Sequence, residues 1–327
     1  MRNANRKQAP PADLDSIFRT GDVLGDAWSW LVMREAVLHD VRRFSQFQAR
    51  LGVARSTLTG RLGQLTAGGL LAERQRPPGP EYHLTESGRD FFGCLMVAMR
   101  WADHWYFDEA TRPTPAIHGA CGQPLETVLR CRHCHRLVFA REVTARRRGP
   151  FTASPPAPLR RRTPDLSLLE RERTCSIART LSVIGDLWTS LIIRESFFGT
   201  RRFDDFQRHL NIAPNILSGR LKRLVDQQVL FKSQYDDWPV RHEYRLTERG
   251  LDLYHVPLAM HTWGRRWIKS DDSDIHLTHK SCGADPQPIL TCDRCGDAIT
   301  RDDIHLQAHA RDHEQAARPA LAWTPNS

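Results

Sequence analysis

The sequence predicts a mainly α chain with a small β content, of the α+β class, in which two similar units stand in tandem. Three observations predict this architecture. Apolar residues recur at helical spacing, a set of short motifs occurs twice about 160 residues apart, and each copy is followed by the same spacing of one histidine and three cysteines. The length of 327 residues suits about two domains.

The composition favours a globular protein with a polyanionic partner. Hydrophobic residues make up 40% of the chain, which excludes wholesale disorder. No run of 18 apolar residues predicts a membrane helix, and residues 1–10 lack the apolar stretch of a secretory signal, so a cytoplasmic location is expected. The net charge is +9, and 42 of the 47 basic residues are Arg, whose planar group binds phosphate bidentately. A compositional habit of the genome is the alternative explanation.

The internal repeat sets the expected domain boundaries. Its offset drifts between 159 and 162 residues, as expected when loops differ in length. The repeated motifs are Gly-Asp-x-Trp at 25–28 and 185–188, Arg-Phe-x-x-Phe-Gln at 43–48 and 202–207, Gly-Arg-Leu at 60–62 and 219–221, and Leu-Thr-Glu-x-Gly at 84–88 and 246–250. We expect folded units at 14–108 and 173–270, cysteine-containing modules at 115–145 and 275–309, an Arg/Pro-rich linker at 146–165, and a disordered tail at 310–327. The linker's Arg triplets are either solvated or in contact with a polyanion.

Unit one has the element order of a winged helix-turn-helix. A helix is expected over 44–51, ended by a glycine, and a second helix begins at about Arg55, with leucines on one face. Strands at about 70–74 and 81–84 flank a proline-rich turn, and a final helix runs over about 85–106. Helix, turn, helix, hairpin, helix is the order of that fold.

Unit two repeats this order. Its first helix ends near Leu210, and Pro214 suits the first position of the second helix. The hairpin spans about 230–246 and is longer than its counterpart. Pro257 is expected to kink the last helix.

The exposed side of each second helix predicts DNA binding. Short polar side chains and a basic group lie opposite the leucines, near the helix start, which suits base edges in a major groove about 12 Å wide. Basic residues of the hairpins and of the supporting helices are placed for phosphate contacts, although each single residue can equally be a solvated group. The candidates are Arg55, Ser56, Thr59, Asn215, Ser218 and Lys222 on the second helices, Arg74, Arg76, Lys232 and Arg241 on the hairpins, and Arg42, Arg43, Arg201 and Arg202 before the supporting helices.

These motifs resemble a known family. The segment 185–224, beginning GDLWTSLIIRE, and EYRLTERG after it are similar to the HxlR-type winged helix-turn-helix regulators of bacteria. The likeness is close over 175–268 and looser over 15–106. It implies a transcriptional regulator that binds double-stranded DNA as a dimer built from terminal helices and often responds to a small-molecule or oxidant signal. Members are generally single-domain homodimers, whereas this chain carries two units and additional modules.

Two units in one chain can form an intramolecular pseudo-dimer. The last helices carry apolar stripes that pack either between the units or inside each unit. Pairing between the units would place the recognition helices roughly 34 Å apart, one DNA turn. Because the two recognition helices differ in sequence, unlike half-sites in an imperfect palindrome are expected. Association of two chains is left open.

Six of the eight cysteines predict two structural zinc sites. Each module has the spacing His-x2-Cys-x9-Cys-x2-Cys, and tetrahedral Zn²⁺ takes four such ligands. We expect each module to close its own site: His118, Cys121, Cys131 and Cys134 in the first, and His279, Cys282, Cys292 and Cys295 in the second. Disulfides and an iron–sulfur centre are alternatives, and His133, His135 and His276 are rival ligands.

Two cysteines lie outside these modules. Cys94 falls among apolar residues and is expected to be a buried thiol. Cys175 matches the N-terminal cysteine with which some members of the resembled family sense oxidants, and a helix N-terminus and Arg173 lie nearby. Cys175 is either such a sensor or a packed side chain.

Three functions compete for this sequence. The first is a sequence-specific DNA-binding transcriptional regulator, and the second is a protein-interaction scaffold that uses the same modules without DNA. The third, a zinc enzyme, is disfavoured because four protein ligands leave no open metal position and no general base is placed nearby. An enzyme is therefore not expected.

Overall fold

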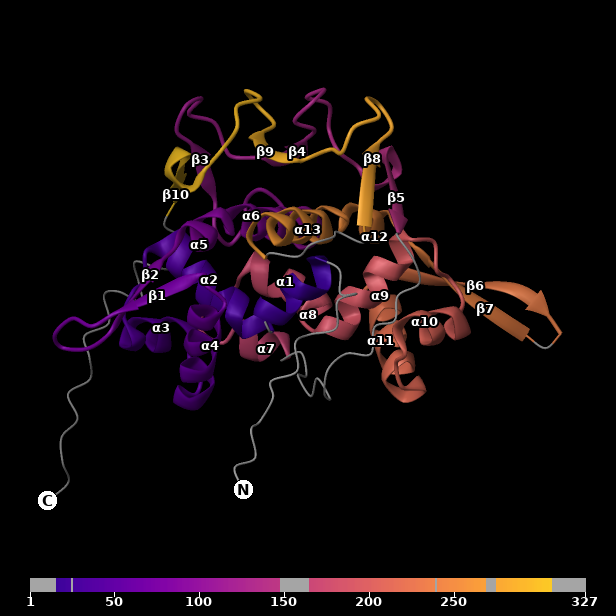
Figure 1. Ribbon diagram of the computed structural model, residues 1–327, viewed down its shortest axis with the longest axis horizontal. Helices are drawn as coiled ribbons and strands as arrows, with labels where there is room; N and C mark the ends of the chain where they lie inside the picture. Colours follow the sequence, from indigo (N-terminus) through magenta and orange to yellow (C-terminus); the bar gives the residue numbers. More distant parts are fainter. Residues whose placement is uncertain (1–15, 25, 148–164, 239, 269–274, 308–327) are drawn as a thin grey trace, which may run out of the picture.

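The computed structural model is a helix-rich α+β structure and describes residues 16–24, 26–147, 165–238, 240–268 and 275–307. Three layers follow one another in Figure 1. The second helices and the hairpins lie at the bottom and flanks, a set of helices fills the centre, and the cysteine-containing modules form the top. The expected tail, most of the expected linker with Arg160, Arg161 and Arg162, and the hairpin residue Pro239 lie outside the described residues.

Both units have the predicted element order. Unit one consists of α1 (Ser16–Leu24), α2 (Ala27–His39), α3 (Phe44–Leu51), α4 (Arg55–Ala67), β1 (Leu71–Arg74), β2 (Glu81–Leu84), α5 (Glu86–Asp90) and α6 (Phe92–Tyr106). Unit two consists of α7 (Leu166–Leu169), α8 (Ser176–Ile184), α9 (Leu187–Phe197), α10 (Phe203–Leu210), α11 (Pro214–Asp226), β6 (Leu230–Asp237), β7 (Val240–Leu246), α12 (Glu248–Asp252) and α13 (His255–Trp267). The final helix expected in each unit is divided into two, with the division at Phe91 in unit one.

Each hairpin is an antiparallel pair whose register follows the apolar residues at its base. Leu71 lies opposite Leu84 in the β1–β2 wing, and Leu230 lies opposite Leu246 in the β6–β7 wing. The second wing is longer and contains an irregularity between Gln234 and Asp236. These wings extend outward on opposite flanks of the molecule (Figure 1).

The repeated Leu-Thr-Glu-x-Gly motif joins each wing to the helix that follows. Thr85 caps α5 by accepting a hydrogen bond from the Gly88 N–H at 3.1 Å, as Thr247 caps α12. A Cβ at Gly88 would collide with the carbonyl oxygen of Leu70, and one at Gly250 would collide with that of Val229. Glycine is therefore required where the helix presses against the base of the wing.

The central helices pack between the units, which decides between the two alternatives for the apolar stripes. Helix α1 packs on α13, and α8 packs on α6. The hydrogen bonds across this interface occur in reciprocal pairs, as a pseudo-twofold arrangement requires. They are Thr20 to the Met260 carbonyl and Thr180 to the Ala98 carbonyl, Trp101 to the Arg249 carbonyl and Trp263 to the Ser87 carbonyl, and Trp105 to Asp252 and Trp267 to Asp90.

The expected kink at Pro257 is wrong. Helix α13 begins at His255, so Pro257 lies in its first turn, where the missing N–H has no intrahelical partner to lose. A turn at Leu253 and Tyr254 separates α12 from α13.

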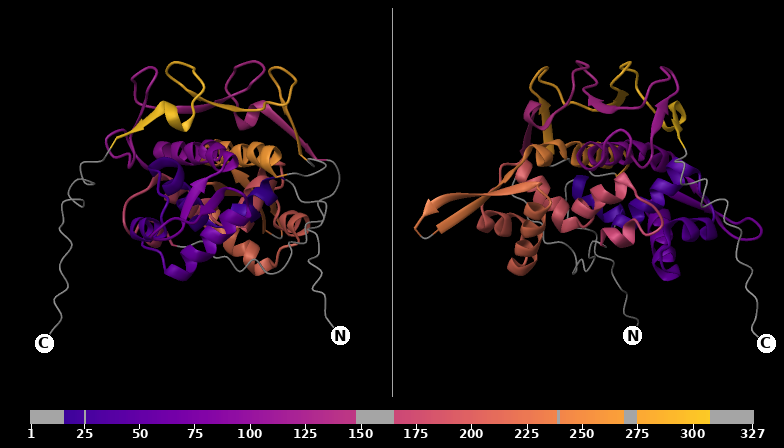
Figure 2. Two further views of the ribbon diagram at one scale, coloured as in Figure 1. Left: turned by 60° about the vertical axis from the view of Figure 1, so that its left-hand side comes forward. Right: turned by 180° about the vertical axis from the view of Figure 1, so that it is seen from behind.

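The module layer is built from strands of both halves of the chain, which pair with each other. Its strands are β3 (Ala116–His118), β4 (Thr127–Arg130), β5 (Val143–Arg147), β8 (Ile275–His279), β9 (Ile289–Cys292) and β10 (Ile304–Leu306), and the 3-10 turns η1 (Ala140–Glu142) and η2 (Arg301–Asp303) precede β5 and β10. Strand β3 pairs with β10, β4 with β9, and β5 with β8, so each pair joins one module to the other. Figure 2 shows the violet-to-magenta and orange-to-yellow segments alternating along this layer. The first two residues of the expected linker belong to β5.

Among the described residues no single helix has the length and hydropathy to cross a membrane. The bent pair α8 and α9, which meet at 79°, meets that criterion by length and composition alone.

Candidate nucleic-acid interface and metal centres

Helices α4 and α11 present their polar faces on one side of the molecule. In α4 the leucines at 58, 62 and 65 are buried, and in α11 those at 217, 221 and 224 are buried. The opposite faces are exposed, including Ser56, Thr59, Asn215 and Ser218. Both helices lie at the face opposite the module layer, seen from the front in Figure 1 and from behind in Figure 2. Two exposed polar helix faces thereby lie on the same side of the molecule.

Two ion pairs that the sequence reasoning missed fix the direction of these helices. Arg61 of α4 contacts Asp26, the residue that caps α2, with 2.9 Å between Nε and Oδ1. Arg220 of α11 contacts Asp186, the cap of α9, at 3.1 Å. The sequence held a clue to these ion pairs, because Asp26 and Arg61 both belong to motifs that are repeated in unit two. Each recognition helix is therefore tied to the start of a core helix.

The predicted DNA-contacting residues lie at the surface, but not all of their charges are free. All fourteen are exposed except Arg43, which is half-buried. Several contact a neighbour: Arg42 pairs with Asp40, Arg43 with Glu81 and Lys222 with Asp226, while Arg55 and Arg202 lie over the rings of Phe44 and Tyr235. The two exposed pairs, Arg42 with Asp40 and Lys222 with Asp226, are weak, about 0–1 kcal/mol, so a phosphate can replace the acidic partner.

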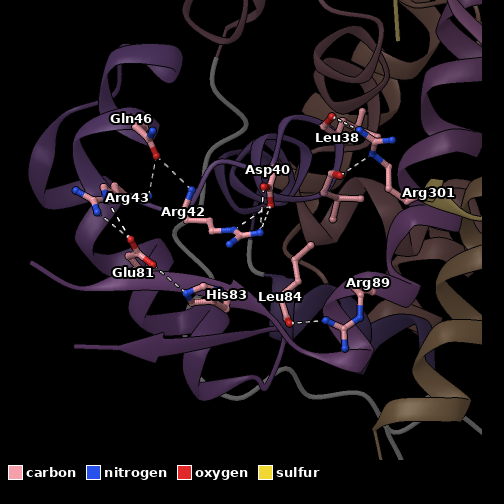
Figure 3. A network of polar contacts seen from close by, with 11 residues as sticks. Leu38, Asp40, Arg42, Arg43, Gln46, Glu81, His83, Leu84, Arg89 and Arg301 are labelled. Carbon is pink, nitrogen blue, oxygen red and sulfur yellow. Dashed lines mark hydrogen bonds and ion pairs between the residues drawn. The ribbon is translucent and has the colours of Figure 1, made fainter. Parts of the chain in front are cut away.

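A polar network joins the helix-turn-helix of unit one to its wing. Figure 3 shows Glu81 of β2 between Arg43, which precedes α3, and His83 on the same strand. Gln46 accepts hydrogen bonds from the backbone N–H groups of Arg42 and Arg43, so the start of α3 is held as well. The base of the wing therefore keeps a fixed position relative to α3.

The wings carry the remaining predicted residues. Arg74 ends β1 and Arg76 lies in the turn, while Lys232 and Arg241 lie on β6 and β7. The tip of the longer wing also carries Trp238, whose side chain is 92% exposed and which the sequence reasoning did not select.

The ligand residues form two clusters, but not the two that the sequence predicted. One cluster holds His118 and Cys121 of the first module with Cys292 and Cys295 of the second. The other holds Cys131 and Cys134 of the first module with His279 and Cys282 of the second. The expectation that each module closes its own site is wrong, because the pairing of β3 with β10 and of β5 with β8 brings ligands together across the modules. The rivals His133, His135 and His276 belong to neither cluster.

The geometry of the clusters fits a tetrahedral ion. Bond lengths of about 2.3 Å to sulfur and 2.0 Å to nitrogen at a tetrahedral angle give S···S of about 3.8 Å and S···N of about 3.5 Å. Cys131 Sγ lies 3.8 Å from Cys282 Sγ. The imidazole Nδ1 of His118 or His279 lies 3.3–3.5 Å from its sulfur neighbours. A disulfide needs about 2.05 Å between sulfurs, and all eight cysteines are free thiols. Each cluster can therefore hold a metal ion.

Cys175 lies at an interface between the units. It caps α8, and its Sγ accepts a hydrogen bond from Arg34 Nη1 of unit one at 2.7 Å. The side chain is buried, and a void of about 10 Å³, close to the smallest space that holds one water molecule, adjoins it. Cys94, in contrast, is a buried thiol whose pKa is raised by burial.

The Arg34 guanidinium belongs to a buried charge cluster centred on Glu35. Burial alone would raise the pKa of Glu35, but Arg34, Arg173 and other nearby cations lower it to about 2. Glu35 accepts hydrogen bonds from Arg34, Arg50 and Arg173, the last of which comes from the segment before α8. The cluster therefore links unit one to unit two.

A cleft separates the helical layer from the module layer on the side of unit one. Its volume is about 1080 Å³, and its walls include Arg89 of α5, Trp263 and Arg265 of α13, Leu277 of β8 and Arg301 of η2. Apolar and cationic groups thus line the same recess.

Comparisons with known proteins identify helix-turn-helix sequences in both units. A family described as HxlR-like helix-turn-helix matches residues 23–110 and 183–272. An uncharacterized HTH-type transcriptional regulator of Mycobacterium tuberculosis is 40% identical over 130 residues, which are 39% of this chain and 82% of that protein. The HTH-type transcriptional regulator YybR of Bacillus subtilis is also uncharacterized and is 32% identical over 110 residues, 33% of this chain and 84% of that protein. A solved structure of a candidate transcription factor from Pseudomonas aeruginosa is 33% identical, covers 42% of this chain and 93% of that chain, and has a TM-score of 0.33.

Proposed function

This chain belongs to the HxlR-like helix-turn-helix family, whose curated members are transcriptional regulators and not enzymes, and from that premise we propose that it binds one operator with both of its winged units. The family membership accounts for DNA binding and transcriptional regulation. Beyond DNA binding in general, we propose that the two units act as an intramolecular pseudo-dimer on an imperfect palindrome. A separate protein partner is not needed for this arrangement.

The position of the recognition helices carries the proposal. Helices α4 and α11 have exposed polar faces on the same side of a chain whose central contacts are reciprocal. Pseudo-twofold symmetry in the protein matches pseudo-twofold symmetry in an operator. Because Ser56 and Thr59 in one unit correspond to Asn215 and Ser218 in the other, the two half-sites are expected to differ.

Both cysteine–histidine clusters are proposed to hold structural Zn²⁺. Three thiolates and one imidazole are borderline-soft ligands that Zn²⁺ prefers, and the interatomic distances suit tetrahedral coordination. His118, Cys121, Cys292 and Cys295 would bind one ion, and Cys131, Cys134, His279 and Cys282 the other. Four protein ligands leave no position for substrate, so the ions support the fold.

Selection of duplexes from a random-sequence pool by the purified full chain tests the proposed function. We expect enrichment of two unlike half-sites and an affinity that falls about 1,000-fold or more between 50 and 200 mM salt if six or more phosphates are contacted. Sequencing of the selected duplexes and fluorescence anisotropy measure both quantities. A chain that enriches no sequence and binds no duplex at 50 mM salt would support the scaffold alternative.

Cys175 is proposed to respond to oxidants. Hydrogen peroxide would transfer one oxygen to the thiol, giving a sulfenic acid and water. The thiol lies against Arg34, and an added oxygen at this buried interface would disturb the packing of α8 on α2. We expect peroxide to weaken DNA binding by about tenfold in the unaltered chain and not in Cys175→Ser.

Two controls separate this effect from damage elsewhere. Cys94→Ala is expected to respond to peroxide as the unaltered chain does, because burial keeps the Cys94 thiol protonated. Metal content is measured in the same samples, since cluster cysteines also oxidise. If peroxide still weakens DNA binding by Cys175→Ser while both ions are retained, a sensor role for Cys175 is excluded.

A further inference from the structure

We propose that the two metal ions clamp the N-terminal half of the chain to the C-terminal half, and that metal occupancy thereby fixes the relative position of the two recognition helices. This inference rests on the proposed function, because the spacing of the helices matters only if both contact one DNA. Its chemical part, the crossing of the ligands, is tested separately.

The ligand sets make each ion a link between the halves. Each cluster takes a His-x2-Cys pair from one module and a Cys-x2-Cys pair from the other. Neither module can complete a four-ligand site from its own residues in this arrangement. Figure 1 shows the consequence, with one violet-to-magenta and one orange-to-yellow loop side by side at each end of the module layer.

The module layer also rests on both units. Arg301 of η2, in the second module, donates hydrogen bonds to the carbonyls of Val37 and Leu38 at the end of α2 in unit one (Figure 3). The corresponding contacts of the first module are made with unit two, where a ring nitrogen of His255 lies 2.9 Å from the Val138 carbonyl. Each module therefore braces the winged unit of the opposite half.

The strands of this layer are too short to hold it together without the ions. Strands β3 and β10 have three residues each, and β5 and β8 have five. Two-stranded pairs of this length are marginal in water, whereas a structural Zn²⁺ supplies much of the folding free energy of small domains that bind it. Without the ions the units would remain associated through α1–α13 and α6–α8, but the brace across their far face would be lost.

Paired cysteine variants test the crossing directly. Cys121→Ser with Cys295→Ser removes two ligands from one cluster and leaves the other complete. The matched control, Cys121→Ser with Cys134→Ser, removes the same number of thiols but damages both clusters. Metal is counted by mass spectrometry after dialysis against a chelator concentration at which the unaltered chain keeps both ions. We expect one retained ion in the first variant and none in the second; the reverse result would overturn the clamp.

The effect on the recognition helices is measured with duplexes selected by the unaltered chain. Metal removal is expected to weaken binding to the two-half-site duplex by about tenfold or more and to leave binding to a single half-site within twofold. Insertion of five base pairs between the half-sites should weaken the metal-loaded chain strongly and the metal-free chain little. If metal removal changes neither affinity nor tolerance of spacing, the clamp does not control the helices. If the metal-loaded chain binds no duplex, the proposed function fails. The metal counts of the paired cysteine variants still show whether each ion takes its ligands from both modules.

Discussion

Replacing both Thr59 and Ser218 by glutamate is expected to reduce DNA affinity by at least about 100-fold. Both side chains lie on exposed faces of the recognition helices, so the substitutions leave the cores of the units intact. A carboxylate facing base edges and phosphates loses a favourable contact and adds repulsion, and each lost base contact costs about 1–3 kcal/mol. Fluorescence anisotropy with a selected duplex measures the change.

A charge-matched control separates this local effect from a change in net charge. Gln123→Glu with Gln287→Glu adds the same two negative charges in exposed loops of the module layer, opposite the recognition helices. We expect its affinity to remain within about threefold of the unaltered chain, since distant surface charges act weakly across a Debye length of about 8 Å. The single variants Thr59→Glu and Ser218→Glu should each weaken binding. If one of them has no effect, only one unit reads DNA.

Replacing Glu35 by glutamine is expected to lower the free energy of unfolding by about 3 kcal/mol at pH 7. The Glu35 carboxylate is fully buried and contacts Arg34, Arg50 and Arg173, whose charges would lose their buried counter-charge. Removing one partner of a buried ion pair typically costs 3–5 kcal/mol. Urea unfolding followed by tryptophan fluorescence measures the loss. Glu86→Gln, at an exposed position of the same unit, should change stability by less than about 0.5 kcal/mol.

The pH dependence of this effect has a defined sign. The pKa of Glu35 is lowered from 4.5 in the unfolded chain to about 2 in the folded chain. Its contribution is therefore fully present above pH 4.5 and is lost as the pH falls from 4.5 to 2. The difference between the unaltered chain and Glu35→Gln should narrow across that window. A difference that stays constant from pH 6 to pH 3 would contradict the assigned role of the Glu35 charge.

The helix-turn-helix and wing of each unit could be predicted nearly to the residue, because their signals are local. Leu58, Leu62 and Leu65 mark one helix face, and α4 begins at the predicted Arg55. Thr85 caps a helix as its sequence position predicts. The division of the last helix was missed, since Phe91 and its neighbours continue the apolar pattern through the break.

The partition of the metal ligands could not be predicted, because the two modules have identical spacing. His118 satisfies the same His-x2-Cys pattern whether its partners are Cys131 and Cys134 or Cys292 and Cys295. Only the long-range pairing of β3 with β10 distinguishes these arrangements. The Glu35 cluster was missed for a related reason, since its partner Arg173 lies 138 residues away in the chain.

A hydroxyl-radical footprint of one selected duplex, combined with the mass of the complex, tests most directly whether both units of one chain read one operator. The account predicts a single chain per duplex and two protected segments of different sequence, with centres about one helical turn apart. Two chains on a perfect palindrome, or one chain that protects a single segment, would contradict it.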